Sequence, residues 1–389
     1  RLERGYHHLF TSDNAILEIM DELGIGESMR WIPSSVGIYT DHEVYRWSTP
    51  IDLLRFSALS FRDRIRMGMV AKKLQRMKDW RALEGITAAE WIRENAGASI
   101  YAKVWEPLLR GKFGDRFESV AMPWFWSKIQ TRFASRDRLG REKLGYPINS
   151  FDEVFETLEE RIKSMGGQVY LETPVTDVLV EDGVATGLRV KHPDGTDTEE
   201  NFDLILSTVP SFAFPKLVDL PETYLKKLGA VEYMGAVVMI LEMTHPLTDV
   251  YWMNIADHEV PFLGLIEHTN LMPKELYGGS NVLYLTNYVE RQSELFLMSD
   301  EELLEVYAPW LPRFNPEFER SWITRIHVNR VSAAQPVIGT NYSQHIPEHQ
   351  TPVSKLFLAN TTQIYPEDRG TNYSIRMGRE IAATMLRGG

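Results

Sequence analysis

The 389-residue chain has no cysteine. Disulfides, thiolate catalysis, iron–sulfur clusters and cysteine-based zinc sites are therefore excluded together. Long hydrophobic runs are also missing, since no stretch approaches the ~18 uninterrupted apolar residues of a membrane-spanning helix. These absences argue against an integral membrane protein and fit a reducing compartment, so we expect the protein to be cytoplasmic.

Positive charge is scarce. The chain has 42 Lys and Arg against 54 Asp and Glu, for a net charge of −12. An acidic balance of this size argues against nucleic acid as a partner, although it allows a local basic patch. Hydrophobic residues make up 43% of the chain, which is typical of a globular protein, and its length predicts two or three domains.

The common catalytic motifs are absent as well. The sequence contains no P-loop, HExxH, GxSxG or EF-hand pattern, and its ten His residues are scattered, so we expect no metal site. It also lacks the G-x-G-x-x-G fingerprint of dinucleotide-binding folds. Gly24-Ile25-Gly26 follows a predicted helix over 12–23 and is interpreted as a helix stop.

Hydrophobic periodicity predicts helices and strands that interleave in two blocks. A mostly helical region over 50–126 includes a capping box at Thr87–Glu90. The other predicted helices cover 152–165, 211–230, 300–311 and 373–386. The predicted strands cover 168–171, 174–180, 185–191, 203–209, 235–243, 262–267, 282–288, 321–330 and 355–359. This order indicates an α/β plus α+β protein of two domains.

Two C-terminal stretches carry a resemblance. Lys355–Gln363 reads KLFLANTTQ and Thr371–Ala382 reads TNYSIRMGREIA. Together they resemble the C-terminal FAD-binding segment of the flavin amine oxidase superfamily, in which a strand ends under the cofactor and a helix then points its N-terminus at the flavin. The resemblance implies that Asn360, Thr361, Asn372 and Tyr373 bind FAD. The sequence departs from the family by having Asn360-Thr361 where Gly-Asp or Gly-Glu is usual.

Two further regions are similar to the same superfamily. Residues 145–210 resemble its block of a helix, a glycine and short strands, which implies cofactor contacts at Val175, Val209 and Pro210. The opening residues 1–10 resemble the stretch that lies beside the isoalloxazine ring and imply contacts at Gly5, Tyr6 and His7.

The resemblance implies a fold and its bounds. We expect an FAD-binding, Rossmann-like domain formed by 1–35, 145–215 and 326–389. A substrate domain of mixed sheet with a helical lid would comprise 36–144 and 216–325. The family's opening strand–GxGxxG–helix unit is not in the sequence. We therefore expect an N-terminally truncated piece of a longer flavoprotein, inactive and a poor FAD binder without the missing unit.

By the same resemblance the function is that of an FAD-dependent oxidoreductase similar to protoporphyrinogen oxidases and amine oxidases, which transfers a hydride from an organic substrate to flavin. Within 250–270, Glu267 and His268 are the candidate catalytic residues, and Tyr251 and Trp252 are the candidate aromatic walls of the substrate cavity. A simpler interpretation makes Glu267 a paired surface carboxylate and His268 a core histidine.

Three alternatives remain open. The chain is also compatible with a carotenoid or phytoene desaturase-like flavoenzyme. A UDP-galactopyranose mutase-like enzyme would need arginines that grip a diphosphate, for which Arg325 and Arg330 are the candidates. The missing pyrophosphate motif would also suit a cofactor-free interaction module.

Residues 61–81 carry eight Lys and Arg against two Asp in this acidic protein. Phe61, Ile65, Met69, Leu74, Met77 and Trp80 are predicted to share a helical face. The simpler interpretation is a lid helix with a solvated face. The other is a basic amphipathic helix that lies peripherally on an anionic membrane, where an enzyme would collect an apolar or polycyclic small-molecule substrate. The sequence does not set the oligomeric state.

Overall fold

The computed structural model describes residues 1–136 and 141–388. These form two compact units: unit 1 comprises 1–13, 27–153 and 233–340, and unit 2 comprises 14–26, 154–232 and 341–389. Both units are discontinuous, as the predicted domains are, but the bounds differ. Residues 1–13, 27–35, 145–153 and 326–340 lie in unit 1, with the predicted substrate domain, while 216–232 lie in unit 2.

The core of unit 1 is a seven-stranded mixed sheet with the order β14-β10-β13-β12-β11-β3-β4. Its strands are β3 (Val36–Thr40), β4 (Glu43–Arg46), β10 (Glu232–Met243), β11 (Trp252–Ile255), β12 (Gly264–Glu267), β13 (Asn281–Val289) and β14 (Ile323–Val337). Strands β3 and β11 run parallel, whereas β11, β12, β13 and β10 pair antiparallel in succession. The predicted strands 235–243, 262–267 and 282–288 are confirmed. The strand predicted over 321–330 continues to Val337, and its pairing with β10 explains why this stretch belongs to unit 1.

One face of this sheet is covered by α11 (Asp300–Tyr307), preceded by the short α10 (Glu294–Leu297). Leu303, Leu304 and Tyr307 of α11 are buried in one apolar cluster with Val237 and Met239 of β10. The predicted helix over 300–311 is thus confirmed, with its last turn in 3₁₀ geometry.

A smaller antiparallel sheet in unit 1 has the order β1-β5-β2. Its strands are β1 (Leu9–Phe10), β2 (Met29–Pro33) and β5 (Lys143–Pro147). Leu9 pairs with Gly145, so the opening residues of the chain lie beside β5. A Cβ at Gly145 would lie 2.7 Å from the Trp31 ring, so a larger residue here would displace that side chain. The sheet thereby brings two segments that are far apart in sequence to one place.

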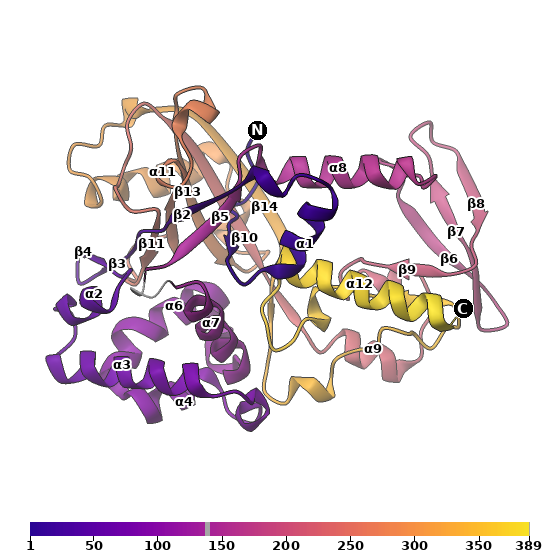
Figure 1. Cartoon of the computed structure of the whole chain (residues 1–389), viewed down its shortest axis with the longest axis horizontal. Coiled ribbons are helices and arrows are strands. Elements are labelled where there is room, and N and C mark those ends of the chain that lie inside the picture. Colours follow the sequence, from indigo (N-terminus) through magenta and orange to yellow (C-terminus); the bar gives the residue numbers. More distant parts are fainter. Residues whose placement is uncertain (137–140, 389) are drawn as a thin grey trace. The chain divides into compact units, whose positions relative to one another are not determined.

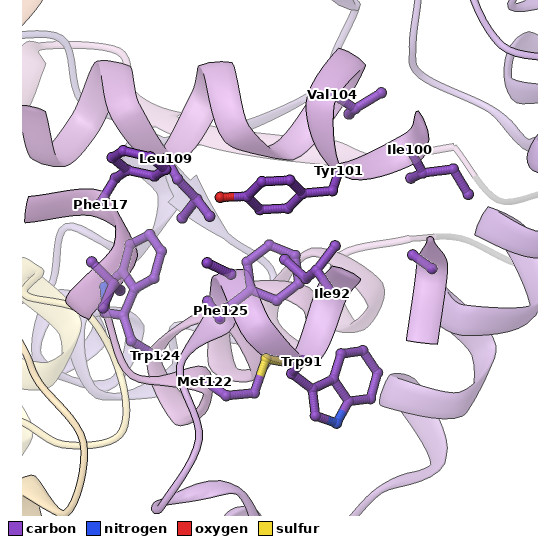
Figure 2. Packing of buried hydrophobic residues seen from close by; sticks show 14 of the residues in the cluster. Trp91, Ile92, Ile100, Tyr101, Val104, Leu109, Phe117, Met122, Trp124 and Phe125 are labelled. Carbon is purple, nitrogen blue, oxygen red and sulfur yellow. The ribbon is translucent and has the colours of Figure 1, made fainter. Parts of the chain in front are cut away.

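The helical block of unit 1 has its own core. Its helices are α2 (Pro50–Arg55), α3 (Phe61–Arg76), α4 (Ala88–Ala96), α5 (Ala98–Ile100), α6 (Glu106–Phe113) and α7 (Met122–Ala134). In Figure 1, α3, α4, α6 and α7 lie close to one another, and Figure 2 shows Tyr101, Trp124 and Phe125 packed among aliphatic side chains. The capping box at Thr87–Glu90 starts α4 as predicted.

Unit 2 combines a parallel strand pair with an antiparallel sheet. Its helices are α1 (Asn14–Glu22), α9 (Glu222–Leu228) and α12 (Thr371–Gly388), and the unit boundary falls within α8 (Ser150–Ser164). Strand β9 (Ile205–Ser207) runs parallel to β15 (Leu356–Leu358). Strands β6 (Val175–Glu181), β7 (Val184–Lys191) and β8 (Asp197–Asn201) pair in chain order.

Most local predictions for unit 2 hold, with two corrections. Residues 168–171 form no strand in the described structure, because they follow the Gly166-Gly167 helix stop without pairing to another strand. The region 211–230 is α-helical only over Glu222–Leu228. Within 1–136 and 141–388, no helix combines the length and apolarity needed to cross a membrane.

Candidate functional site

His268 lies at the centre of a buried tyrosine cluster in unit 1. It follows the last residue of β12, and its ring packs edge-on against Tyr146, Tyr277 and Tyr284, with centroids 5.1, 5.1 and 5.9 Å away. Its Nε2 lies 2.6 Å from the Tyr277 hydroxyl. Its Nδ1 is buried and has no hydrogen-bond partner in the described part of the chain. Burial lowers the pKa of His268 to about 4, so the ring is neutral at pH 7.

The cluster continues from His268 to Glu3. The Tyr146 ring contacts His268, and the Tyr146 hydroxyl donates to the Glu3 carboxylate. The backbone N–H of Phe151 donates to the other carboxylate oxygen at 3.0 Å, and the Tyr284 hydroxyl donates to the Glu3 carbonyl at 3.2 Å. Burial raises the pKa of Tyr277 to about 12, so its phenol stays protonated. A ring contact and a hydrogen bond, both made by Tyr146, therefore link His268 with Glu3, and no motif in the sequence marks Glu3.

Glu267 points elsewhere. Its Oε2 accepts hydrogen bonds from the backbone N–H of Leu247 at 2.9 Å and of Thr248 at 3.4 Å, and its Oε1 accepts one from the Thr269 hydroxyl at 3.3 Å. The residue is fully buried, so its interpretation as a surface carboxylate is wrong. Burial raises the pKa of Glu267 to about 7, although these hydrogen bonds act in the opposite direction. Glu267 anchors the 247–248 loop, whereas His268 joins the tyrosines.

The opening segment lies against the predicted substrate residues. Tyr6 contacts Trp252 edge-on, with ring centroids 4.9 Å apart. The Tyr251 hydroxyl lies 3.1 Å from His8 Nδ1, and burial lowers the pKa of His8 to about 3. Residues from the predicted cofactor segment and from the predicted substrate wall are thus brought together.

Gly5 and His7 lie at the edge of the same arrangement. The exposed His7 ring contacts Phe151 at a centroid distance of 5.6 Å, and its Nδ1 lies 2.8 Å from the Gly5 carbonyl. Their contact with a flavin stays a prediction.

In unit 2, Asn360 joins the ends of the two parallel strands. Its Nδ2 donates to the Val209 carbonyl at 3.0 Å and to the Ser211 hydroxyl at 3.2 Å. Its Oδ1 accepts from the N–H and the hydroxyl of Thr362 at 3.1 and 2.8 Å, so Asn360 caps the 3₁₀ turn Thr361–Gln363. The side chain therefore holds the loop after β15 to the Val209-Pro210 segment after β9. A direct role of Asn360, Thr361, Val209 or Pro210 in cofactor binding stays a prediction.

Ser207, which the sequence did not mark, ends β9. It pairs with Leu358 of β15, and its carbonyl accepts the N–H of Ala359 at 2.9 Å. Its hydroxyl oxygen is buried without a hydrogen-bond partner among the described residues. A buried hydroxyl left unpaired at the carboxyl end of a parallel strand is a position where a bound polar group would be favourable.

The other predicted cofactor residues of unit 2 have structural contacts. Asn372 Oδ1 accepts the backbone N–H of Ala15 at 2.9 Å and thereby caps α1. The Tyr373 ring lies under the Arg376 guanidinium, 5.1 Å from its centroid. Val175 begins β6 and pairs with Val190. These contacts explain the local fold and leave any cofactor contact of Asn372, Tyr373 and Val175 a prediction.

Another cluster that the sequence did not reveal surrounds the β3–β4 turn. Asp41 and His42 both have positive φ, and the Asp257 carboxylate accepts both of their N–H groups, at 2.8 and 2.9 Å. His42, Asp257 and Glu259 each offer one atom that could bind a metal ion, and these three atoms lie within 4.8 Å of one another. These residues and their neighbours line a cavity of about 460 Å³. Stabilisation of the strained turn accounts for the position of Asp257.

The arginines considered for a diphosphate are placed differently from each other. Arg330 donates to the carbonyls of Phe296 and Met298 and to Asp300, so its guanidinium is held within the protein. Arg325 is exposed and lies 3.9 Å from Glu242. The two side chains therefore do not form a shared anion grip.

The mixed α/β fold with a mixed sheet agrees with the fold class that the resemblance implies. Residues 1–386 match the family described as flavin containing amine oxidoreductase. The chain belongs to this family, whose members are flavoproteins. No curated protein matches the sequence.

Solved structures support the fold. A proposed protoporphyrinogen oxidase from Exiguobacterium sp. 255-15 has a TM-score of 0.74 at 16% identity, over 99% of this chain and 88% of the other. A reduced UDP-galactopyranose mutase has a TM-score of 0.73 at 13% identity, over 99% and 83%. Cyclohexylamine oxidase from Brevibacterium oxydans IH-35A has a TM-score of 0.70 at 12% identity, over 99% and 88%. At these identities the likeness shows the fold alone.

Proposed function

We propose that this protein is an FAD-dependent oxidoreductase that removes a hydride from an organic substrate. The observation that carries the proposal is the parallel β9–β15 pair, whose carboxyl ends meet at one edge where the Ser207 hydroxyl is left without a partner. Cofactors in open α/β sheets bind outside the carboxyl ends of parallel strands. Membership of a flavin-containing family makes flavin the cofactor that suits this edge.

The residues of unit 2 fit such a group. Ser207 offers a free donor, and Asn360 holds the two strand ends together. Helix α12 begins at Thr371 and has no acidic residue in its first turn, so its N-terminal N–H groups would favour a negatively charged group. We infer that this edge is part of a Rossmann-like FAD-binding domain. Bound flavin would supply the redox chemistry by taking up the hydride that the substrate loses.

Unit 1 supplies groups suited to proton handling and to aromatic contacts. His268 is neutral at pH 7 and has a free ring nitrogen, so it is able to accept a proton. Its hydrogen bond to Tyr277 fixes the ring, and its contact with the Tyr146 ring leads toward Glu3. We propose His268 as the acid–base residue and Tyr6 and Trp252 as aromatic contacts for an apolar or polycyclic small molecule.

The oxidoreductase is favoured over the mutase because Arg330 is held by protein groups and forms no diphosphate grip with Arg325. The flavin-binding experiment described below also tests the desaturase and the cofactor-free interaction module. Reduction of bound flavin by a polyene substrate alone would indicate the desaturase. A chain that binds no flavin in any form would favour the interaction module.

The first test is the visible absorbance spectrum, recorded with added FAD and after removal of free cofactor. It is run on the chain of 389 residues and on the product of its complete open reading frame. Flavin bands that co-purify with either protein, and that bleach on anaerobic addition of an amine or a reduced tetrapyrrole, would support the proposal. Absence of flavin from both proteins would contradict it.

The second test compares two buried serines that each have an unpartnered hydroxyl. Ser207→Ala is expected to weaken FAD binding by roughly fivefold or more, the effect of losing one hydrogen bond worth about 1 kcal/mol. Ser28→Ala, in unit 1, removes an equally buried and unpartnered hydroxyl and serves as the control. Equal FAD affinity of the two variants would show that Ser207 does not contact the cofactor.

A further inference from the structure

Helix α3 has apolar residues on two opposite faces. Met67 and Leu74 are buried in the helical core of unit 1. Phe61, Ile65 and Met69 recur every four residues along the other side and are 66%, 42% and 60% exposed. The single apolar face predicted from the sequence is therefore wrong, because Leu74 points inward and these three residues point outward.

The neighbouring helix extends this exposed apolar surface. Helix α2 packs against α3, as Figure 1 shows, and a Cβ built on Gly68 would lie 3.8 Å from the Leu53 side chain. Ile51 and Leu54 of α2 are 58% and 45% exposed. The surface formed by Ile51, Leu54, Phe61, Ile65 and Met69 is here called the α2–α3 patch. Large apolar side chains that gather on a surface mark an interaction site.

Unpaired positive charge accompanies the patch. Arg55, Arg62, Lys72 and Arg76 are exposed, and within the described residues none of them has an acidic partner. Lys72 and Arg76 continue the outward face that begins with Phe61. This local excess of positive charge stands out in a chain with a net charge of −12.

The remaining charges of α3 are already engaged. Arg64 donates to the carbonyls of Leu54 and Leu59, and Arg66 donates to that of Asn95. Asp63, the acidic residue of the helix, accepts a hydrogen bond from the Ser60 hydroxyl. The charges left for a partner are therefore positive.

We propose that the α2–α3 patch docks on an anionic lipid bilayer, with the apolar side chains inserted at the headgroup boundary and the basic side chains on lipid phosphates. Apolar insertion together with basic flanks is the combination that holds a helix in the membrane interface. A second copy of this chain fits less well, because a symmetric contact would place Arg62 and Arg76 against the same positive charges. The proposal does not depend on flavin binding.

The test is co-sedimentation with vesicles of phosphatidylcholine alone and vesicles that also contain phosphatidylglycerol. Binding is expected only to the anionic vesicles and should decrease at high salt. The apolar variant, Phe61→Ser with Ile65→Ser and Met69→Ser, is expected to bind at least about tenfold more weakly. Its control is Met165→Ser with Leu171→Ser and Leu386→Ser, which removes three exposed apolar side chains from unit 2.

The charge variant is Arg62→Gln with Lys72→Gln and Arg76→Gln. At about fivefold per charge, it is expected to bind about a hundredfold more weakly. Its control, Arg161→Gln with Lys191→Gln and Lys216→Gln, changes the net charge equally with exposed residues of unit 2. Because all of these side chains are exposed, thermal unfolding should be nearly unchanged in every variant.

Three results would overturn the proposal. The first is equal binding to neutral and anionic vesicles, or to neither. The second is an equal loss in a patch variant and in its control. The third is a dimer in size-exclusion chromatography that the apolar variant converts to a monomer, which would assign the patch to a second copy of the chain.

Discussion

Replacing the buried Glu267 with glutamine is expected to stabilise the protein increasingly as the pH rises. The carboxyl is fully buried, and burial raises its pKa to about 7 from an ordinary 4.5. Glutamine keeps an oxygen for the Leu247 and Thr248 N–H groups and offers its amide to the Thr269 hydroxyl, which now donates to Glu267. The variant therefore preserves the loop anchor and removes the titration.

The sign and size of the effect follow from the pKa difference. Between about pH 4.5 and 7 the folded state holds a proton that the unfolded state has released, so the contribution of Glu267 to stability is lost as the pH rises through this window. A difference of about 2.5 pKa units corresponds to about 3 kcal/mol. Glu267→Gln should thus exceed the wild type by about 1 kcal/mol at about pH 5 and by about 3 kcal/mol at about pH 8.

His268 acts in the opposite direction. Its pKa is lowered from 6.5 to about 4, so the stability linked to it is present above pH 6.5 and is lost as the pH falls. In the wild type the two effects offset each other between about pH 4.5 and 6.5. His268→Gln should therefore reveal the decline with rising pH that Glu267 causes, and Glu267→Gln the rise that His268 causes.

The assay is urea unfolding of both variants and the wild type across this pH range. Glu275→Gln, which removes one carboxylate from an exposed position, is the control. If the difference between Glu267→Gln and the wild type does not grow with pH, burial of the carboxyl does not govern its titration and the reasoning is refuted.

Two further predictions concern single positions in unit 2. Asn372→Ala should lower the free energy of unfolding by about 1 kcal/mol, because α1 loses the acceptor for its first N–H groups. Asn372→Asp keeps an acceptor oxygen and should retain most of that stability. Equal losses of the two variants in urea unfolding would show that the cap does not matter. Lys355 has a φ of 65°, a conformation that glycine adopts more easily than other residues. Lys355→Gly should therefore raise the urea midpoint of unfolding by relieving about 0.5 kcal/mol of net strain, while Lys355→Ala should change the midpoint little. A destabilised glycine variant would contradict this account.

The sequence alone was sufficient to predict those parts of the structure that depend on neighbouring residues along the chain. The capping box at Thr87–Glu90, the helix stop at Gly24 and the helices over 14–22 and 371–388 follow from periodicity and terminal residues, which are local properties. The family resemblance also rests on local segments, and the match over 1–386 confirms it. Local pattern could not say which side of α3 faces the core, because both sides are apolar.

Long-range contacts were decided by the tertiary structure. The pairing of β14 with β10 places 326–340 in unit 1, contrary to the predicted domain bounds. Glu267 and His268 are adjacent in sequence and were predicted together, yet one anchors a loop and the other joins a tyrosine cluster that reaches Glu3. The side chains of Asn360 and Asn372 are engaged by strand ends and by a helix that are distant in sequence. Residue type and periodicity determine which segments form helices and strands; only the packing of those segments determines what each polar side chain meets, and therefore which of them are left for a ligand.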